Sequence, residues 1–404
     1  MSTTTLDRRS KKHIDWILIA MVYAISIFGI YSIAIATYSP DTDMESTLLN
    51  YIISSTNSMW QAIFVLASPI VLVIITKSIP YHVLKRNAMM IYFVTIPVLA
   101  FVLGTKQING ISAWFRVGAG RSFQPSEVAK IAMIVTFAKL LSGNEKPMGN
   151  MRSFWKLMLL FGVPAVLIIL QPDVGTFLVF VFMFFVMLWF AGVDWKVIVG
   201  IVLAAALFAG LLFLTASLSG SDSYRVQRIM SFLDPASGAL DTAYQQTNAK
   251  RAIGAGGLFG IGQFIEGSYS QLDFVPEDWT DFIFSSIGEA FGFVGSAGLI
   301  IMYLLVIIRL VYLARYTPDK FGQLVIIGVA SILLFHVLEN IGMNIGLLPI
   351  TGIPLPFVSY GGSNYMTNMA GIGLVLNVVN NRSSIDVEDN TQNIRKKTRR
   401  MSNI

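Results

Sequence analysis

The sequence predicts an all-α, multi-pass integral membrane protein, and three observations lead to that fold class. Only 13% of the 404 residues are charged and 54% are hydrophobic, whereas soluble domains carry about a quarter charged residues. Several apolar stretches reach the roughly 20 residues that a helix needs to cross a bilayer about 30 Å thick. None of them alternates with the period of two that a membrane β-barrel requires.

About ten membrane helices are predicted, each from an apolar run bounded by polar or helix-breaking residues. They cover residues 15–37, 58–77, 88–104, 124–142, 155–170, 174–192, 195–217, 282–313, 321–346 and 361–380. The first run is too long for a secretory signal peptide and no small-residue cleavage site follows it, so we expect it to remain as an anchor. Residues 1–14 and 381–404 are expected to be cytoplasmic tails of a membrane domain that covers residues 15–380.

The basic residues predict that both termini face the cytoplasm. With ten spans, most of the 29 lysines and arginines fall on the side of the termini, including the tail "IRKKTRR" (394–400), as the positive-inside rule requires. The large segment of about 218–281 and the segments 105–123 and 347–360 then lie outside. The net charge of +6 follows from this asymmetry, so it indicates contact with anionic membrane lipids and not with nucleic acid.

The absence of cysteine excludes disulfides and thiolate metal sites. The glycine-rich stretch "GAGGLFGIG" (254–262) lacks the spacing of a nucleotide-binding loop and follows no predicted strand. Its glycines are therefore expected to form a tight turn or a partly embedded loop.

A polar cluster enters the predicted helix 124–142 through the stretch "GISAWFRVGAGRSFQPSEVAKIAM" (110–133). An unpaired Lys130 inside a span would cost roughly 2.5–3.5 kcal/mol, and Glu127 lies three residues earlier on the same helix face. Two interpretations stay open: an ion pair at the helix entry, or one polar wall of a substrate cavity. The residues that would complete such a wall are Trp114, Arg116, Arg121 and Gln124.

Two further clusters lie on the predicted outer side. In "LQPDVGT" (170–176), Asp173 is either the N-cap of the next helix or a substrate contact. The segment Asn340 to Asn364, "NIGMNIGLLPITGIPLPFVSYGGSN", is too irregular for lipid contact and predicts a cavity lining. Its polar residues Asn340, Asn344, Ser359 and Ser363 would line that cavity or form hydrogen bonds between helices.

The stretch "FVPEDWTDFIFSSIGEAFG" (274–292) places Glu277, Asp278 and Asp281 directly before an apolar run that begins at Phe282. A carboxylate there lies at the end of a predicted membrane helix, close to the membrane surface. Asp281 is either a general base or, as the structural alternative, the N-cap of the helix, next to Thr280.

Taken together, these motifs resemble the SEDS family (shape, elongation, division and sporulation) of bacterial cell-wall proteins, over residues 14–380. The motifs that carry the resemblance are "QPSEVAKI" (124–131), "LQPDVGT" (170–176), "RIMSFLDP" (228–235), "AYQQTNAKRAIGAGGLFGIG" (243–262), the stretch 274–292 and "GLLPITGIPLPFVSYGGS" (346–363). The resemblance implies a peptidoglycan glycosyltransferase of the bacterial cytoplasmic membrane. It would polymerise lipid II and work with a single-pass class B penicillin-binding protein.

The resemblance also implies roles for single residues. The essential acid of the family lies in the motif "TDFIF", which falls on Asp281, and general-base help is worth about 10² to 10⁴ in rate. Substrate contacts are expected at Trp114, Arg116, Gln124, Glu127, Lys130, Asp173, Arg228, Tyr244, Gln245, Glu277 and Ser359. The cations expected to meet the leaving diphosphate are Arg116, Arg121, Arg225, Arg228, Lys250 and Arg251. A divalent cation, magnesium or manganese, could share that task, although no spacing in the sequence establishes one.

Two positions depart from the family pattern. Ala290 stands where a second acid commonly follows Gly288 and Glu289, and Asp278 stands where a basic residue is common. The stretches "HIDW" (13–16) and "TNMAGIGLVLNV" (367–378) favour the RodA-like elongation branch over the FtsW-like division branch. A lipid II flippase and a scaffold for a partner enzyme are the other functions considered, and the two halves of the sequence show no inverted repeat of the kind transporters have.

Overall fold

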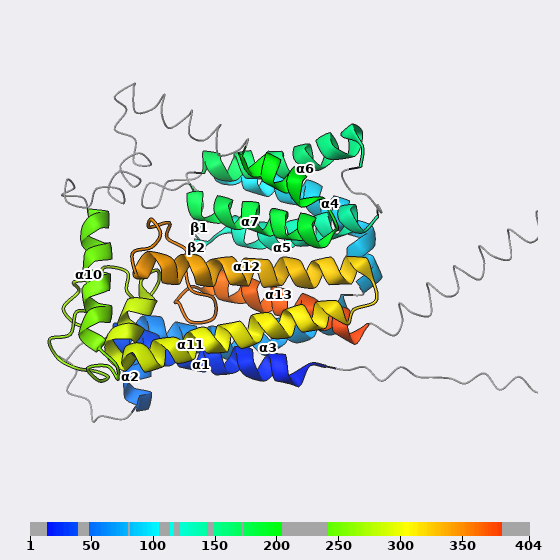
Figure 1. Cartoon of the computed structure of the whole chain (residues 1–404). Helices are drawn as coiled ribbons and strands as arrows, with labels where there is room; N and C mark the ends of the chain where they lie inside the picture. Colours follow the sequence, from blue (N-terminus) through cyan, green and yellow to red (C-terminus); the bar gives the residue numbers. More distant parts are fainter. Residues whose placement is uncertain are drawn as a thin grey trace, which may run out of the picture.

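The computed structural model describes residues 14–38, 48–79, 81–104, 114–116, 122–143, 149–171, 173–203 and 241–381. Within these ranges the chain forms a bundle of long helices that run along a common direction (Figure 1). The prediction of an all-α membrane protein is confirmed. The sheet within the described ranges is one antiparallel pair of two-residue strands, β1 (Phe115–Arg116) and β2 (Ser122–Phe123).

The helices follow the predicted order with shifted bounds. They are α1 (Trp16–Ala36), α2 (Leu48–Ser54), α3 (Thr56–Val73), the π-helical turn η1 (Ile74–Ser78), α4 (Tyr81–Val102), α5 (Pro125–Ser142), α6 (Met151–Leu170), α7 (Val174–Phe190), α10 (Asp241–Gly256), α11 (Ile283–Arg315), α12 (Lys320–Asn344) and α13 (Gly362–Asn380). The helix predicted over 195–217 is described only through residue 203. Helices α2 and α10 were not predicted, because α2 is short and α10 is too polar for a hydropathy signal.

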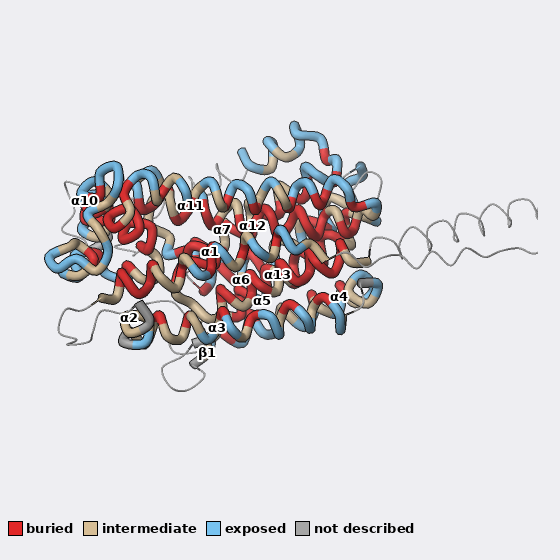
Figure 2. Tube along the Cα trace, turned by 90° about the horizontal axis from the view of Figure 1, so that it is seen from below, coloured by how far each residue is buried: buried red, intermediate tan, exposed pale blue. Residues whose placement is uncertain are grey.

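Six of the described helices are long and apolar enough to cross a membrane, namely α1, α3 with η1, α4, α6, α11 and α12. Helix α12 is the central helix. In its 18-residue apolar stretch, 78% of the residues are buried inside the protein, compared with 17% in that of α4. Figure 2 shows the same contrast between the buried α12 and the exposed outer faces of α3 and α4. The outer helices therefore offer their apolar side chains to lipid, and the residues around α12 form the interior.

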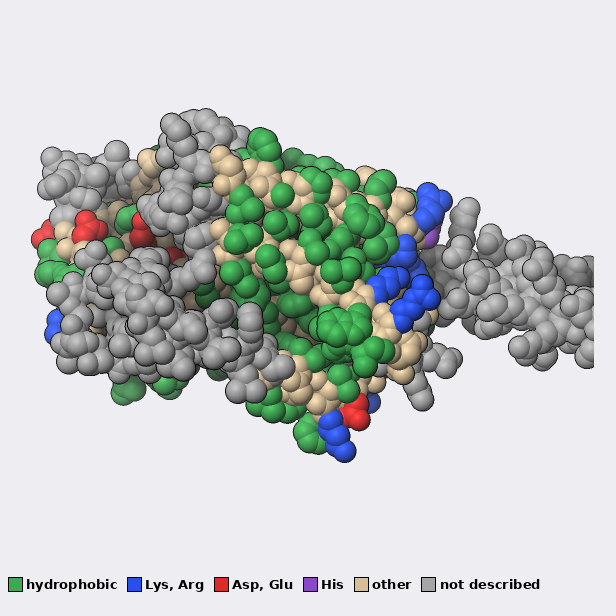
Figure 3. Space-filling view, turned by 90° about the horizontal axis from the view of Figure 1, so that it is seen from above, with side chains coloured by type: hydrophobic (Ala, Val, Ile, Leu, Met, Phe, Trp, Pro, Cys, Tyr) green, Lys and Arg blue, Asp and Glu red, His purple; other side chains and the backbone are tan. Residues whose placement is uncertain are grey.

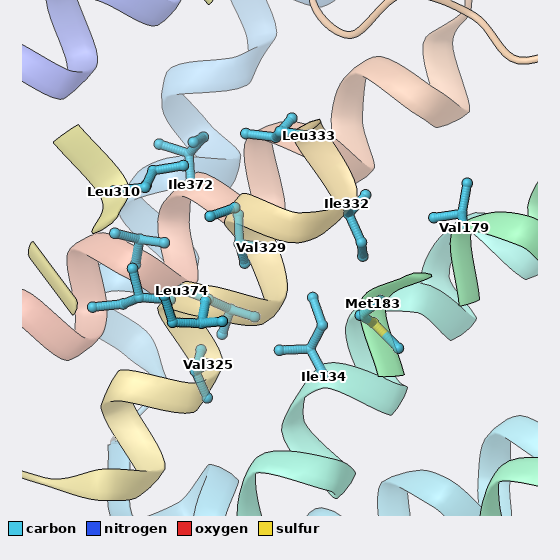
Figure 4. Packing of buried hydrophobic residues seen from close by; sticks show 14 of the residues in the cluster. Ile134, Val179, Met183, Leu310, Val325, Val329, Ile332, Leu333, Ile372 and Leu374 are labelled. Atoms are coloured by element: carbon cyan, nitrogen blue, oxygen red, sulfur yellow. The ribbon is translucent and has the colours of Figure 1, made fainter. Parts of the chain in front are cut away.

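The interior around α12 is closely packed and apolar. Ile134 of α5, Met183 of α7, Val329 of α12 and Ile372 of α13 belong to one buried cluster (Figure 4). A Cβ added at Gly328 of α12 would lie 2.8 Å from the Cγ2 atom of Ile134. Small residues of this kind allow membrane helices to approach each other closely.

The two ends of the bundle differ in charge. We call the end that carries α10 and the segments 257–282 and 345–361 the loop end, and the opposite end, where α1 begins and α13 ends, the terminal end (Figure 1). The lysines and arginines on the face in Figure 3 gather mainly at the terminal end. There Arg309 of α11 makes an ion pair of 2.7 Å with Asp15, which also caps α1. The predicted orientation, with the termini in the cytoplasm, agrees with this distribution.

The glycine-rich stretch 254–262 packs against a break in α11. Gly292 has φ +65° and ψ −160°, which interrupts the helix. The main chain of the stretch fills this break, since Phe293 N donates to Gly257 O (2.9 Å) and Val294 N donates to Leu258 O (3.0 Å). A Cβ at Gly260 would lie 2.1 Å from Ala290 O. Close approach of two main chains therefore explains Gly256 and Gly260, a reason that the predicted tight turn or partly embedded loop did not include.

Candidate functional site

Asp281 lies at the loop end, immediately before α11. The N-cap residue of α11 is Phe282, which makes no side-chain cap hydrogen bond. Ser285 N donates instead to Asn344 Oδ1 of α12 (3.1 Å). The alternative in which Asp281 caps this helix is therefore wrong, because the cap falls one residue later and a neighbouring helix supplies the acceptor.

The main chain around Asp281 is fixed by a row of hydrogen bonds. The carbonyl of Asp281 accepts from Asn340 Nδ2 (2.8 Å) and from Asn344 Nδ2 (3.1 Å). Ser359 Oγ donates to the carbonyl of Thr280 (2.5 Å), and Tyr360 N donates to the carbonyl of Trp279 (3.0 Å). Three consecutive carbonyls are thus held by α12 and by the segment 345–361, so the position of the Asp281 main chain is defined from two sides.

The segment 345–361 passes beside the Asp281 carboxylate. Gly352 has φ +75°, and a Cβ added there would lie 3.2 Å from Asp281 Oδ2. The next residue back, Thr351, donates through Oγ1 to Glu339 Oε1 of α12 (2.6 Å). A Cβ at Gly175 of α7 would lie 3.0 Å from Thr351 O. This segment therefore lies between Asp281 and the start of α7.

At the start of α7, Asp173 makes two hydrogen bonds. Its Oδ1 atom accepts from Thr176 N (3.0 Å), so its predicted role as the N-cap is confirmed. Its Oδ2 atom accepts from Gln124 Nε2 (2.8 Å), which joins α7 to the entry of α5. Two of the predicted substrate-contact residues are thus brought together at the loop end of the bundle.

One turn further into α5 lies a buried ion pair. Lys130 Nζ is 2.9 Å from Glu127 Oε1, and the two residues are only 2% and 4% exposed. Asn364 of α13 donates to Glu127 Oε2 (3.3 Å), and Lys130 Nζ lies 3.1 Å from His336 Nε2 of α12. Because an ammonium group only donates, His336 accepts through Nε2 and carries its proton on Nδ1. The predicted pair exists, and it joins three helices.

The remaining predicted site residues are more scattered. Tyr244 and Glu277 are exposed, Gln245 and Trp114 are half-buried, and Glu277 accepts a hydrogen bond from Thr280 Oγ1 (3.2 Å). Next to them in sequence, Gln246 was not predicted but is buried, and it donates to the carbonyls of Met343 and Leu348. Lys250 and Arg251 are exposed on α10. The predictions for the side chain of Arg116 and for Arg121, Arg225 and Arg228 concern parts of the chain that lie outside the described residues.

Two functional candidates escaped the sequence reasoning. His336 and Glu339, three residues apart on α12, are 1% and 4% exposed and contact Lys130 and Thr351 respectively. A signal was present, because ionisable residues within an otherwise apolar span are costly and mark functional positions. The long apolar run of α12 obscured it.

The described part of the chain does not contain three or more His, Asp or Glu side chains close enough to hold a metal ion together. The carboxylates of Asp173 and Glu339 are engaged by Gln124 and Thr176 and by Thr351 respectively. Among the described residues, this donor set does not fit a divalent cation held by protein ligands alone. What the arrangement offers is a carboxylate on a fixed main chain at the loop end of a membrane bundle.

The sequence matches one family model and several known proteins. The family model for FtsW, RodA and SpoVE, described as "Cell cycle protein", matches residues 12–384. Peptidoglycan glycosyltransferase MrdB of Escherichia coli is 36% identical over 322 residues, which cover 79% of this chain and 85% of the relative. Stage V sporulation protein E of Bacillus subtilis is 37% identical over 285 residues, which cover 70% and 75%. A probable peptidoglycan glycosyltransferase FtsW from a Geobacter strain is 35% identical over 308 residues, which cover 75% and 82%.

Solved structures have the same fold. A chain from a study titled "Structural coordination of polymerization and crosslinking by a peptidoglycan synthase complex" matches with a TM-score of 0.75 and 30% identity, covering 91% of this chain and 98% of the other. The rod shape determining protein RodA of Thermus thermophilus matches with a TM-score of 0.66 and 28% identity, covering 91% and 97%. The likeness therefore extends over almost the whole length of both proteins.

Proposed function

This chain belongs to the FtsW, RodA and SpoVE family of cell cycle proteins. From this membership we infer that it is a peptidoglycan glycosyltransferase of the bacterial cytoplasmic membrane. The relatives MrdB and FtsW carry that activity in their names, and its apolar helices make it a multi-pass membrane protein. The finer proposal is that it polymerises lipid II, a disaccharide-peptide on a polyprenyl diphosphate. The observation that carries this proposal is the fixed position of Asp281 at the loop end of the bundle.

In the proposed reaction, Asp281 is the general base. It takes the proton of an acceptor sugar hydroxyl while that oxygen forms a bond to the anomeric carbon of the lipid-linked donor. The bond between the anomeric carbon and the diphosphate breaks, and the diphosphate leaves with the bonding electron pair. The geometry supports this role, because the carbonyl bonds from Asn340 and Asn344 fix the main chain of Asp281 next to Gly352, and orientation of a catalytic group contributes to the rate.

The leaving diphosphate requires positive charge. Lys250 and Arg251 on α10 are exposed at the loop end, and a Cβ at Gly346 would touch the Lys250 side chain. We propose that these two residues, together with Arg116, Arg121, Arg225 and Arg228, bind the phosphate oxygens, since guanidinium groups bind phosphate in a bidentate way. A divalent cation, if one takes part, would need the substrate phosphates among its ligands.

The experiment that tests this function is polymer formation by the purified protein in detergent micelles supplied with lipid II. We expect glycan strands longer than the input disaccharide, separated by gel electrophoresis. The flippase alternative predicts no polymer, because a flippase acts only across a bilayer. Transport of lipid II in vesicles without any polymerisation in micelles would overturn the proposal in favour of that alternative.

A partner enzyme and a cellular role complete the proposal. A structural neighbour comes from a study of a peptidoglycan synthase complex that coordinates polymerization and crosslinking, and we propose a single-pass class B penicillin-binding protein as the partner here. The stretches "HIDW" and "TNMAGIGLVLNV" support a role in elongation. Depletion of the protein should then give round cells, whereas filamentous cells would indicate a division role.

A further inference from the structure

A chain of hydrogen bonds runs beneath the turn that carries Asp281. Asp278 Oδ2 lies 3.1 Å from Ser286 Oγ, Ser286 Oγ lies 3.0 Å from Ser270 Oγ, and Ser270 Oγ lies 2.9 Å from Glu289 Oε2. All four residues are buried, with exposures of 1% to 4%. The chain connects the segment 257–282 with the first two turns of α11.

Counting protons along this chain determines its charge. Each of the three oxygen-to-oxygen contacts needs one proton, and a hydroxyl carries only one. Ser270 and Ser286 supply two protons, so the third must come from one of the two carboxyl groups. If both acids were ionised, one pair of buried oxygens would face each other at hydrogen-bond distance with no proton between them.

The surroundings decide which carboxyl holds that proton. Glu289 also accepts from two main-chain amides, Tyr269 N (2.6 Å) and Ser270 N (3.1 Å), and such donors stabilise a carboxylate. Asp278 receives no amide bond within the described part of the chain, and its Oδ1 atom has no partner there. A buried carboxylate oxygen without a donor is far more costly than a buried neutral carbonyl oxygen.

We propose that Asp278 is a neutral carboxylic acid that donates to Ser286, that Glu289 is the ionised end of the chain, and that this single proton fixes the turn bearing Asp281. The direction of donation then runs from Asp278 to Ser286, from Ser286 to Ser270 and from Ser270 to Glu289. Asp278 is in this sense a positioning residue: its side chain is tied to α11, and Thr280 N and Phe282 N bond back to Glu277 O to close the turn. The positioning role rests on the function proposed for Asp281, whereas the protonation state does not.

The electrostatics of the turn agree with this assignment. Burial raises the pKa of the Asp278 carboxyl well above its usual range, and the charges of Asp273 and Glu289 raise it further, while the hydroxyls of Ser286 and Ser270 lower it. The acids that face Asp278 are therefore Asp273 from its own segment and Glu289 from α11. The adjoining α10 contributes Ala249 and Ala252 to the nearby apolar cluster, and these bring no charge.

The first test uses infrared difference spectra of the full-length protein in detergent at neutral pH. Wild type minus Asp278→Asn should show the carbonyl stretch of a protonated carboxylic acid, shifted in deuterium oxide. A difference that contains only carboxylate bands would overturn the proposal. No lipid II is used, so this result is independent of whether the protein proves to be a polymerase.

The second test compares thermal unfolding of two matched variants across pH. A carboxyl with a raised folded pKa contributes stability below its unfolded pKa of about 3.9, and this contribution is lost as pH rises towards the folded pKa. Asp278→Asn keeps a donor to Ser286 and cannot ionise, so its unfolding midpoint at neutral pH should equal or exceed that of wild type and should fall less as pH rises. Glu289→Gln should lower the midpoint by about 2 °C or more, because an amide cannot accept all three bonds. The reverse order of the two variants would place the proton on Glu289 and overturn the proposal.

The positioning role has its own readout in the pH profile of polymerisation. Wild-type activity should decline on the alkaline side, where Asp278 ionises and the donor to Ser286 is lost. Asp278→Asn should extend activity to higher pH. An identical alkaline limb in both proteins would remove the positioning role.

Discussion

Buried asparagines donate hydrogen bonds to main-chain carbonyls at both the loop end and the terminal end of the bundle, but the carbonyls belong to different kinds of residue. At the terminal end, Asn377 of α13 donates to the carbonyls of Ile75 (2.6 Å) and Ile79 (2.7 Å) around the π-helical turn η1. At the loop end, Asn340 and Asn344 of α12 donate to the carbonyl of Asp281. The same type of hydrogen bond therefore fixes the connection between two helices at the terminal end and the main chain of an acidic residue at the loop end.

This difference shows how a membrane bundle can carry a catalytic group at its surface. Irregular main chain at membrane depth must find hydrogen-bond donors within the protein, and both ends satisfy that need. At the loop end, the held carbonyl belongs to an acidic residue, which lies next to a segment with glycines of positive φ, namely Gly346 and Gly352. Hydrogen bonds to irregular main chain therefore stabilise both ends of the bundle, whereas at the loop end they also position a candidate catalytic acid.

The largest difference between the two ends is expected in the stability that is lost when an ion pair is broken. Replacing Lys130 with Met leaves Glu127 buried without its cation, and breaking a buried pair in this way costs about 3–5 kcal/mol. Replacing Arg309 with Met at the terminal end should cost less, because the Arg309 side chain is 28% exposed and Asp15, which is 6% exposed, keeps its hydrogen bond from Leu18 N. Unfolding midpoints of the two variants in detergent measure the difference.

The double variant Glu127→Gln with Lys130→Met separates the two interpretations of this pair. Recovery of both yield and polymerisation would mean that the pair is structural, as at the terminal end. Recovery of yield alone would keep it in the substrate site. Equal losses for Lys130→Met and Arg309→Met would remove the contrast between the two ends.

Two glycines of α11 test the same contrast within one helix. Gly292, in the break at the loop end, has φ +65°, and a Cβ there would lie 2.4 Å from Gly260 N. Gly292→Ala should therefore lower stability by about 1–3 kcal/mol and reduce polymerisation, because this part of α11 follows Asp281. Gly298, further towards the terminal end, has nothing within 4 Å of an added Cβ, so Gly298→Ala should be neutral or stabilising. Thermal unfolding of both variants would show whether the break is required.

The asparagines themselves give the most selective comparison. Asn340→Ala removes a donor from the carbonyls of Asp281 and Ile353, and Asn377→Ala removes donors at the terminal end. Each change should cost about 1–3 kcal/mol, the penalty for a buried carbonyl without a partner. Polymerisation per folded molecule should fall for Asn340→Ala and stay at the wild-type level for Asn377→Ala. Equal rates per folded molecule would show that the carbonyl bonds do not position Asp281.

Much of the fold could be predicted because the membrane imposes a simple pattern. The apolar runs of α1, α11 and α12 identified these helices directly. Helix α10 escaped because it is polar. The break at Gly292 could not be predicted either, because it depends on contact with a stretch more than 30 residues away in sequence. The glycines of that stretch are visible in the sequence, but by themselves they fit several turn types.

The site was predicted in part for similar reasons. Asp173 and Gln124 were singled out separately, and only the fold shows that they bond to each other. Asn340 and Asn344 were expected either to line a cavity or to bond to other helices, and the structure confirms hydrogen bonding. Tertiary contacts of this kind leave no periodic signal in a sequence. His336 was missed because it stands alone in an apolar run, where the partner Lys130 lies on a different helix.

The role of Asp281 as the general base of glycosyl transfer is tested most directly by the initial rate of lipid II polymerisation by Asp281→Asn in detergent. The account predicts a loss of about 10² to 10⁴ in rate with the unfolding midpoint unchanged. Glu266→Gln, a change at an exposed acid of the same outer segment, should retain the wild-type rate. A folded Asp281→Asn protein that polymerises lipid II as fast as wild type would contradict the claim.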